Sequence, residues 1–277
     1  MVANVRLEIA SRPENLLLVR EMLAGLAEGI ALDGDDLHDI RTAVTEACNN
    51  VVQHAYPAGE GALEVEVRVA AGTIDVVVRD HGSGIRPHIR PLQGGRLGLG
   101  IPIIQALAER VQYTGAVGGG TEITMTFATP GIRALQTSRE NGVAANAIAF
   151  TERASTTRLT LVPARLARTI LARLLSALGA RAHFSTGRIS DSRLLAGALA
   201  ACSPAPDGED RLGVAIAVRP RDLRLRVGPL RSDRARDVIG HAALGGVNPV
   251  LEEMGDGSAV AGPERPEMLM LTLLDSG

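Results

Sequence analysis

The 277-residue chain contains no lysine and no tryptophan, and aromatic residues make up only 2% of it. Without lysine, no ε-ammonium group is available to clamp a phosphate or to form a Schiff base. With so few aromatic side chains, the chain lacks the stacking platform on which single-stranded nucleic acids bind. The formal net charge of −2, without a dense basic run, provides no field that would attract nucleic acid or an acidic membrane. We therefore expect no direct nucleic-acid partner and no membrane partner.

Cysteines and long hydrophobic runs are also scarce. The two cysteines, Cys48 and Cys202, lie in different halves without a metal-binding spacing, so the sequence supports neither a zinc site nor a disulfide framework. No apolar run approaches the ~18 residues of a membrane span, and the first residues do not follow the pattern of a secretory signal. These absences favour a cytoplasmic location. Hydrophobic residues at 45% and charged residues at 22% are typical of a soluble globular protein, and the length favours two domains.

The hydrophobic pattern of the first half predicts strands and helices in alternation. Alternating residues predict strands over 5–10, 63–69, 74–78 and 122–127, and helical spacing predicts helices over 12–26, 35–55 and 101–111. Residues 81–100 follow neither period, and a loop of this length is usually functional. Residues 130–155 lose all periodicity and gain Ser, Asn, Thr and Gly, which indicates a linker between domains 1–129 and 156–277.

The second half aligns with the first at a constant separation of 152 residues. Residues from 157 lie over residues from 5 without a gap, which matches Arg6 with Arg158, Leu7 with Leu159, Leu23 with Leu175 and Leu26 with Leu178. After a short deletion, residues 64–78 lie over 213–227, and 122–127 lie over 267–272. We interpret this pattern as a duplicated fold. The alternative is that two leucine-rich helical segments align through composition alone.

Glu46 and Asn50 lie one turn apart on the predicted helix 35–55, on the face opposite its apolar stripe. An amide oxygen is a hard ligand suited to Mg²⁺, and a carboxylate can orient or deprotonate an attacking hydroxyl. On their own, these two residues also fit an ordinary solvated helix face.

Two glycine-rich segments accompany this helix. Asp80-His81-Gly82-Ser83-Gly84-Ile85 follows a predicted strand, where glycines allow a tight turn and Asp80 can accept a hydrogen bond from an exocyclic amine such as that of adenine. The alternative is a plain surface turn. The second segment, 94–102, runs into a helix whose first turn can present N–H groups to phosphate. It fits neither the dinucleotide fingerprint nor the P-loop.

Together and in this order, these segments resemble the GHKL, or Bergerat-fold, ATPase superfamily over about residues 5–129. Glu46-Ala-Cys-Asn-Asn50 resembles its N-box, Asp80-x-Gly82-x-Gly84 its first glycine box, Gly98-Leu99-Gly100 its second, and Gly120-Thr121 its closing Gly-Thr. The compact module, with its N-box followed by His54-Ala55-Tyr56-Pro57, looks like the anti-sigma-factor serine/threonine kinases.

The resemblance implies an α+β fold, a two-layer sandwich with a mixed sheet and helices on one face, which binds ATP and Mg²⁺. It implies that Glu46 is the general base, Asn50 the Mg²⁺ ligand, and Asp80 and Thr121 the adenine-side contacts. The remaining cofactor-binding positions are Gly82, Gly84, Ile85, Gly98, Leu99 and Gly100, of which Gly98 and Gly100 cradle the triphosphate. A lid over about 85–97 carries Arg86, Arg90 and Arg96, any of which can approach the γ-phosphate.

The implied partners are a sigma factor and an anti-anti-sigma antagonist protein that is phosphorylated on Ser or Thr. Two alternatives remain: an ATP-gated regulator that transfers no phosphate, and a stand-alone histidine-kinase-like catalytic module. At the 152-residue separation, Glu46 falls on Ala198 and Asn50 on Cys202, so 156–277 is expected to be a degenerate ATPase-like domain without nucleotide-site residues. The kinase would then act as a homodimer or as an intramolecular pseudo-dimer.

Overall fold

The computed structural model describes residues 3–83, 100–115, 119–132, 156–201, 210–230, 238, 247–253 and 267–275. The elements of the first half are β1 (Ala3–Ala10), η1 (Pro13–Asn15), α1 (Leu16–Ile30), α2 (Gly34–His54), β2 (Ala62–Ala70), β3 (Thr73–Asp80), α3 (Gly100–Leu107), β4 (Arg110–Gly115) and β5 (Thr121–Ala128). The elements of the second half are β6 (Thr156–Val162), η2 (Ala164–Leu166), α4 (Ala167–Arg181), α5 (Thr186–Ala201), β7 (Leu212–Arg219), β8 (Asp222–Leu230), β9 (Val247–Glu253) and β10 (Glu267–Leu274).

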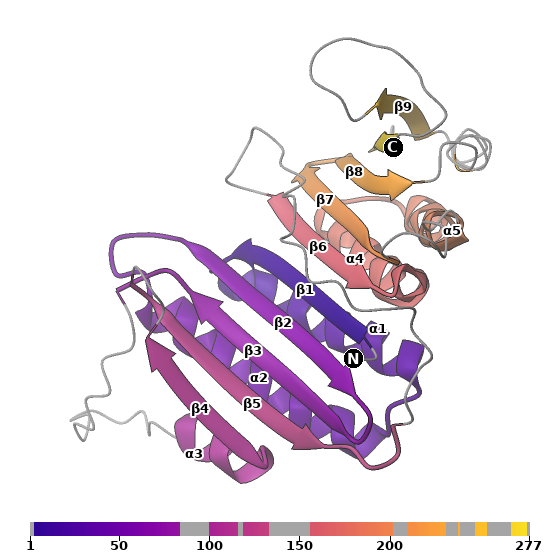
Figure 1. Cartoon of the computed structure of the whole chain (residues 1–277). Coiled ribbons are helices and arrows are strands. Elements are labelled where there is room, and N and C mark those ends of the chain that lie inside the picture. The colour runs from indigo at the N-terminus through magenta and orange to yellow at the C-terminus, as the bar shows by residue number, and fades with distance from the viewer. Residues whose placement is uncertain are drawn as a thin grey trace.

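Helices cover one face of a single ten-stranded sheet, in the order β4-β5-β3-β2-β1-β6-β7-β8-β10-β9 (Figure 1). Along β1 the residues alternate between buried and half-buried, because one set of side chains packs under the helices and the other faces away from them. The core under the helices is aliphatic, as the shortage of aromatic residues requires. Its largest fully buried side chains include Leu7, Leu18, Met22, Ile40, Leu63, Ile74, Ile104, Ile123, Leu159 and Ile170. The expected two-layer α+β sandwich is confirmed.

The sheet is antiparallel at every pairing between described strands, which corrects the expectation of a mixed sheet. Two helices, α1 and α2, connect β1 to β2, and this pair of helices returns the chain in the opposite direction. Helix α3 is the one described helix between β3 and β4, and these two strands run in the same direction. However, β5 inserts between them and pairs antiparallel with both.

The predicted strands and helices are present, with one boundary error, and two strands, β4 and β9, were not predicted. The helix expected over 101–111 ends at Leu107, and Arg110 already pairs with Thr126 in β4. The backbone N–H of Glu109 donates to the carbonyl of Thr126, so this backbone joins the sheet ladder and cannot continue a helix. Strand β9 was not predicted; it pairs with β10 as β4 pairs with β5.

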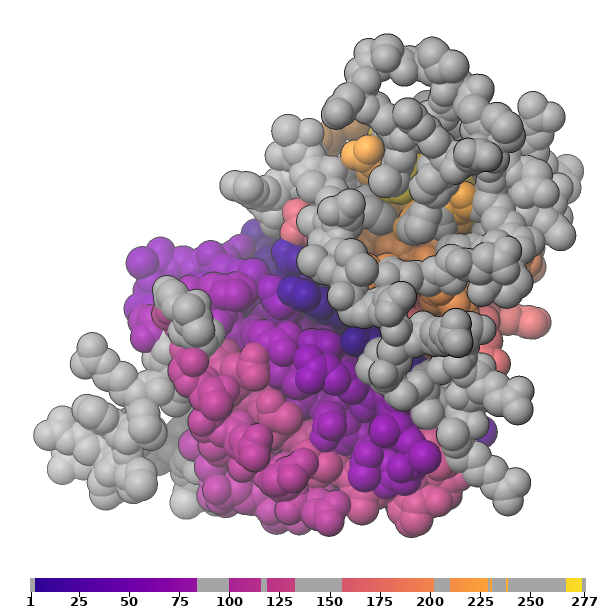
Figure 2. All heavy atoms as spheres, in the orientation of Figure 1, coloured from indigo at the N-terminus to yellow at the C-terminus, as the bar shows by residue number. Residues whose placement is uncertain are grey.

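Apart from α3, which has no counterpart among the described residues, the second half repeats the order of elements of the first half. Outward from the central β1–β6 pair, corresponding strands follow in the same order on both sides of the sheet. Strands β1 and β6 pair antiparallel at that centre, and Leu7 lies directly opposite Leu159, the residue 152 positions later. Helix α1 packs beside α4, and Figure 2 shows the two halves lying directly against each other. Residues with a positive φ also occupy corresponding positions in the two halves. Ala31 corresponds to His183, and Gly72 in the β2–β3 turn corresponds to Arg221 in the β7–β8 turn. The two halves are therefore related by an approximate twofold rotation.

No helix in the described part of the chain combines the length and the hydropathy that crossing a bilayer requires.

Candidate active site

Helix α2 fixes the directions in which Glu46 and Asn50 point. Asp33 precedes its first residue, and the Asp33 side chain accepts a hydrogen bond of 2.9 Å from the N–H of Asp35 and so caps the helix. Its apolar stripe is buried at Ile40, Val44, Cys48 and Val51. Because this stripe sets the rotation of the helix, Glu46 and Asn50 are held half-buried at the margin of the core.

The start of α3 meets these two side chains. A Cβ built on Gly100 would lie 3.2 Å from Glu46 Oε2 and 3.6 Å from Asn50 Oδ1. Ile104, one turn later, is fully buried and anchors α3 against the core. The N-terminal end of α3, whose first N–H groups have no partner within the helix itself, thus lies beside a carboxylate and a carboxamide. The sequence predicted both groups but not their contact.

Asp80 ends β3 as a fully buried carboxylate with one unused oxygen. Its Oδ1 accepts a hydrogen bond of 2.9 Å from the N–H of Gly82, whereas Oδ2 has no hydrogen-bond partner among the described residues. A buried acceptor without a donor costs about 1–3 kcal/mol. The site therefore favours a ligand that brings a donor to this atom, and an exocyclic amine is such a donor.

The turn after Asp80 is fastened to the end of α2. The N–H of Ser83 donates to the carbonyl of Ala55 at 2.9 Å, and the N–H of His81 donates to Tyr56 Oη at 2.9 Å. A Cβ at Gly82 would lie 2.0 Å from the Ala55 carbonyl oxygen, so this position requires glycine. Burial raises the pKa of Tyr56, which keeps its hydroxyl protonated to donate to the carbonyl of Ala62 at 2.6 Å.

The Gly119-Gly120-Thr121 segment crosses this turn. Gly119 and Gly120 have φ values of 105° and 100°, in the region that favours glycine, and a Cβ at Gly120 would lie 2.1 Å from the Asp80 carbonyl oxygen. Thr121 is buried and precedes Glu122, which pairs with Arg79 next to Asp80. Side chains alternate along a strand, so Thr121 and Asp80 lie on the same face at the same end of β5 and β3.

The structure thus brings together six of the predicted site residues in two adjoining groups along α2. Glu46, Asn50 and Gly100 form one group beside the middle of the helix, and Asp80, Gly82 and Thr121 form the other at its end. The other predicted site and lid residues, Gly84, Ile85, Gly98, Leu99, Arg86, Arg90 and Arg96, lie outside the described residues. The sequence reasoning missed the part played by Tyr56, although its motif was noted; no local signal links Tyr56 to His81, 25 residues later.

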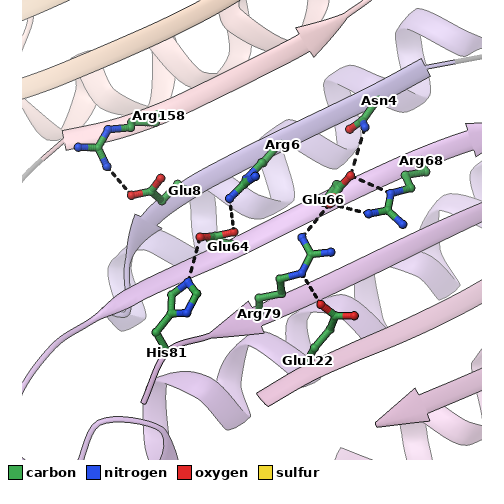
Figure 3. Close-up of polar contacts among 10 residues, drawn as sticks. All are labelled: Asn4, Arg6, Glu8, Glu64, Glu66, Arg68, Arg79, His81, Glu122 and Arg158. Atoms are coloured by element: carbon green, nitrogen blue, oxygen red, sulfur yellow. Dashed lines mark hydrogen bonds and ion pairs between the residues drawn. The ribbon is translucent and has the colours of Figure 1, made fainter. Parts of the chain in front are cut away.

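The opposite face of the sheet carries a network of ion pairs (Figure 3). Glu66 is its centre and binds Asn4 at 3.1 Å, Arg68 at 2.7 Å and Arg79 at 2.8 Å; Arg79 also binds Glu122 at 2.5 Å. Burial alone would raise the pKa of Glu66, but the two guanidinium groups outweigh it and lower the pKa to about 2. This network lies across the sheet from the candidate site and stabilises the strands that carry Asp80 and Thr121.

The first half of the chain matches a known protein-family model. Residues 9–127 match the family model of the histidine kinase-like ATPase domain. This segment contains both glycine turns and the α2 helix that define the site. Residues 9–127 are therefore similar in sequence to the histidine kinase-like ATPase domain, and the match does not extend into the second half.

Curated proteins that are similar to this half of the chain carry the name serine-protein kinase RsbW. The serine-protein kinase RsbW of Bacillus licheniformis is 29% identical over 136 residues, which cover 44% of this chain and 83% of the relative. RsbW of Halalkalibacterium halodurans is 28% identical over 120 residues, which cover 39% of this chain and 74% of the relative. Among solved structures, the RsbU and RsbW domains of a Mycobacterium tuberculosis protein match with a TM-score of 0.35 and 23% identity, over 45% of this chain and 32% of that chain.

Proposed function

We propose that this protein is an ATP-dependent protein serine/threonine kinase of the anti-sigma-factor type. The observation that carries the proposal is the contact of Gly100, at the start of α3, with Glu46 and Asn50. A base, a metal ligand and a phosphate-binding helix terminus thereby meet at one point. The relatives named serine-protein kinase align over most of their own length with the half that carries this point.

The residues present fit a magnesium-bound adenine nucleotide. The unused Asp80 Oδ2 fits the exocyclic amine of adenine. Gly82 lets the turn after Asp80 pack against the Ala55 carbonyl, and Gly100 lets the start of α3 approach Glu46 and Asn50. Thr121 would contact the adenine side, Gly82, Gly84 and Ile85 would flank it, and Gly98, Leu99 and Gly100 would hold the phosphates. Asn50 would hold Mg²⁺, which when bound neutralises charge on the phosphates.

Glu46 is the proposed general base. It would accept the proton of a serine or threonine hydroxyl as that oxygen bonds to the γ-phosphorus and the bond to the bridging oxygen breaks, which leaves ADP and a phosphorylated side chain. The proposed substrate is a small antagonist protein, and the proposed binding target of the kinase is a sigma factor, as the family resemblance implies.

The second half is proposed to be a degenerate copy that serves as a built-in partner. Domain boundaries of 1–129, 130–155 for the linker and 156–277 follow from this interpretation. In support, Ala198 in α5 stands where α2 carries Glu46, while β6 and α4 lie against β1 and α1 as a partner subunit would. The chain would then work as an intramolecular pseudo-dimer with one nucleotide site.

Phosphotransfer from radiolabelled ATP tests the proposal. The full chain is incubated with Mg²⁺ and a candidate antagonist encoded by a neighbouring gene, and acid-stable label on the antagonist is expected. Glu46→Gln should abolish the label, and Asp39→Asn, a carboxylate two turns earlier on the same helix, should retain it. Acid-labile label would instead indicate a histidine-kinase-like module. Nucleotide binding without any label on the antagonist would indicate an ATP-gated regulator.

A further inference from the structure

A cavity of about 210 Å³ lies at the junction of the two halves, away from the α2–α3 contact. The first half lines it with the end of β1 and η1, and the second half with the start of β6, the end of α4 and the β7–β8 turn. Its polar lining residues are Arg12, Asn15, Thr156, Thr157, Arg181, His183 and Arg219. We propose that this cavity is a binding site for a small phosphate-type oxyanion.

Three guanidinium groups line this cavity: Arg12 from the loop between β1 and η1, Arg181 from the end of α4, and Arg219 from the end of β7. Arg181 donates to the neutral Asn15 Oδ1 at 2.6 Å, and its nearest paired carboxylate, on Glu14, is 3.9 Å away. Arg12 pairs with Glu60 at 2.6 Å. Neither Glu14 nor Glu60 lines the cavity, and each of these carboxylate side chains is 51% exposed. The described lining thus contains three arginines and no acidic residue, which makes it basic.

The side chains that hold these groups are themselves fixed. Asn15 is buried, and its Nδ2 donates to the carbonyl of Ala10 at 2.8 Å, which turns Oδ1 toward Arg181. His183 has a left-handed φ of 61°, and the N–H of Arg221 donates to the neighbouring Ala182 carbonyl at 2.7 Å, which ties the end of α4 to the β7–β8 turn. Thr157 is buried at the start of β6. The backbone segments that carry these donors are therefore held in place by hydrogen bonds and burial.

The approximate twofold rotation provides an internal comparison. Five of the polar lining residues correspond to small apolar ones at the opposite end of the junction: Arg12 to Ala164, Asn15 to Ala167, Arg181 to Gly29, His183 to Ala31, and Arg219 to Ala70. At that end the space is filled, because a Cβ at Gly29 would lie 2.7 Å from Leu166 Cδ2. The shared architecture therefore does not require the basic cavity, which is a property of one end alone.

The chemistry of the lining selects the ligand class. Guanidinium groups bind phosphate oxygens in bidentate, charge-assisted pairs, and a threonine hydroxyl and an imidazole N–H supply further donors. The volume lies below the ~300 Å³ at which pockets for drug-sized ligands begin, so a small anion fits better than a large organic molecule. Such an anion would contact both halves at once and would stabilise the junction between them.

Thermal unfolding of the full chain with inorganic phosphate or pyrophosphate tests the site, in EDTA and at an ionic strength held constant with sodium chloride. Binding to the folded state alone should raise Tm by roughly 5 °C once the anion reaches 100 times its Kd. Arg181→Gln should weaken the apparent affinity at least tenfold, because one charge-assisted contact is lost. Arg168→Gln, an exposed arginine of α4 outside the cavity, is the matched control and should bind as the wild type does.

Two further variants make the result decisive. If Arg181→Gln folds poorly because Asn15 loses its partner, Arg219→Gln must show the same loss of affinity. Asn50→Ala, in the candidate nucleotide site, should leave the anion-induced rise in Tm unchanged. No rise with either anion at 50 mM, or an equal loss in Arg168→Gln, would overturn the proposal without bearing on the kinase function. A loss in Asn50→Ala would also overturn it, because the anion would then bind in the candidate nucleotide site instead.

Discussion

At Asn50, ligand binding and stability can be separated, because the side chain lies at the margin of the core and its neighbours Ala47 and Val51 supply the packing. We expect Asn50→Ala to reduce Mg-ATP affinity at least tenfold, while the free energy of unfolding changes by less than about 1 kcal/mol. Calorimetric titration and urea unfolding measure the two quantities. Gln53→Ala, an exposed position on the same helix, is the control for both. A loss of stability as large as the loss of binding would contradict the role of Asn50.

Asp80 has a more specific task, since its unused Oδ2 is an acceptor in a fully buried position. Asp80→Asn should lower the preference for ATP over GTP at least tenfold, because the new NH₂ group opposes an amine donor and tolerates a carbonyl. Competition binding with the two nucleotides measures this ratio. Asp75→Asn serves as the control, because Asp75 is also on β3 but accepts a hydrogen bond from Thr126 on the other face. An unchanged ratio would rule out Asp80 as the adenine reader.

At the scale of elements, the site depends on two backbone segments that nearly touch. Gly120→Ala should destabilise the fold by about 1–3 kcal/mol and abolish nucleotide binding, because its φ is 100° and its Cβ would lie 2.1 Å from the Asp80 carbonyl oxygen. Thermal unfolding and titration with ATP measure both losses. Gly34→Ala, where a Cβ would meet nothing within 4 Å, should keep full stability and binding. A fully stable Gly120→Ala protein would show that the two segments do not approach this closely.

The paired strands also predict a pH dependence. Glu66 has a folded-state pKa of about 2, below the unfolded value near 4.3, so the unfolded state binds more protons between these values. Its contribution is therefore complete above about pH 5 and is lost as the pH falls through 2. After discounting for solvent screening, this contribution is about 1–2 kcal/mol.

Urea unfolding of Glu66→Gln between pH 2 and 7 tests this assignment. The variant should be less stable than the wild type at pH 7, and the difference should shrink toward pH 2. Glu109→Gln is the control, because the Glu109 carboxylate forms no ion pair with a described residue. A constant difference across the whole range would exclude Glu66 as the titrating group.

At the scale of the molecule, charge distinguishes the two halves along their junction. Arg173 binds Glu21 at 3.4 Å and Glu28 at 3.2 Å, and Arg158 binds Glu8. In each of these pairs the carboxylate comes from the first half. Glu21 and Arg173 occupy equivalent positions, so two first halves in this arrangement would place Glu21 against Glu21. The charges therefore favour pairing of unlike halves.

Arg173→Glu should accordingly lower the free energy of unfolding by about 1 kcal/mol. Exposed ion pairs contribute about 0.2–1 kcal/mol each, and in this variant like charges face each other across the junction. Adding Glu21→Arg should restore about half of the loss, and urea unfolding of the four proteins in the double-mutant cycle measures this coupling. Arg168→Glu provides the control on the same helix. Purely additive effects would show that the junction does not depend on these charges.

The sequence by itself determined the local features of this protein. Helical spacing predicted the buried stripe of α2 and the position of Glu46 and Asn50 beside it, and the glycines predicted both turns. These properties could be predicted because they depend on residues close together in the chain. Alternation likewise predicted β1, β2, β3 and β5. It did not predict β4, whose residues are nearly all exposed at the sheet edge and carry no alternation.

Only the tertiary structure decided how the pieces meet. Periodicity reports which face of a strand is buried but not which edge pairs with which, because the backbone hydrogen bonds that join β1 to β6 are the same for almost any sequence. The unused oxygen of Asp80, the contact of Gly100 with Glu46, and the basic cavity between the halves all depend on groups distant in the chain. Their positions follow from the packing of the whole sheet and its helices, which no local pattern encodes.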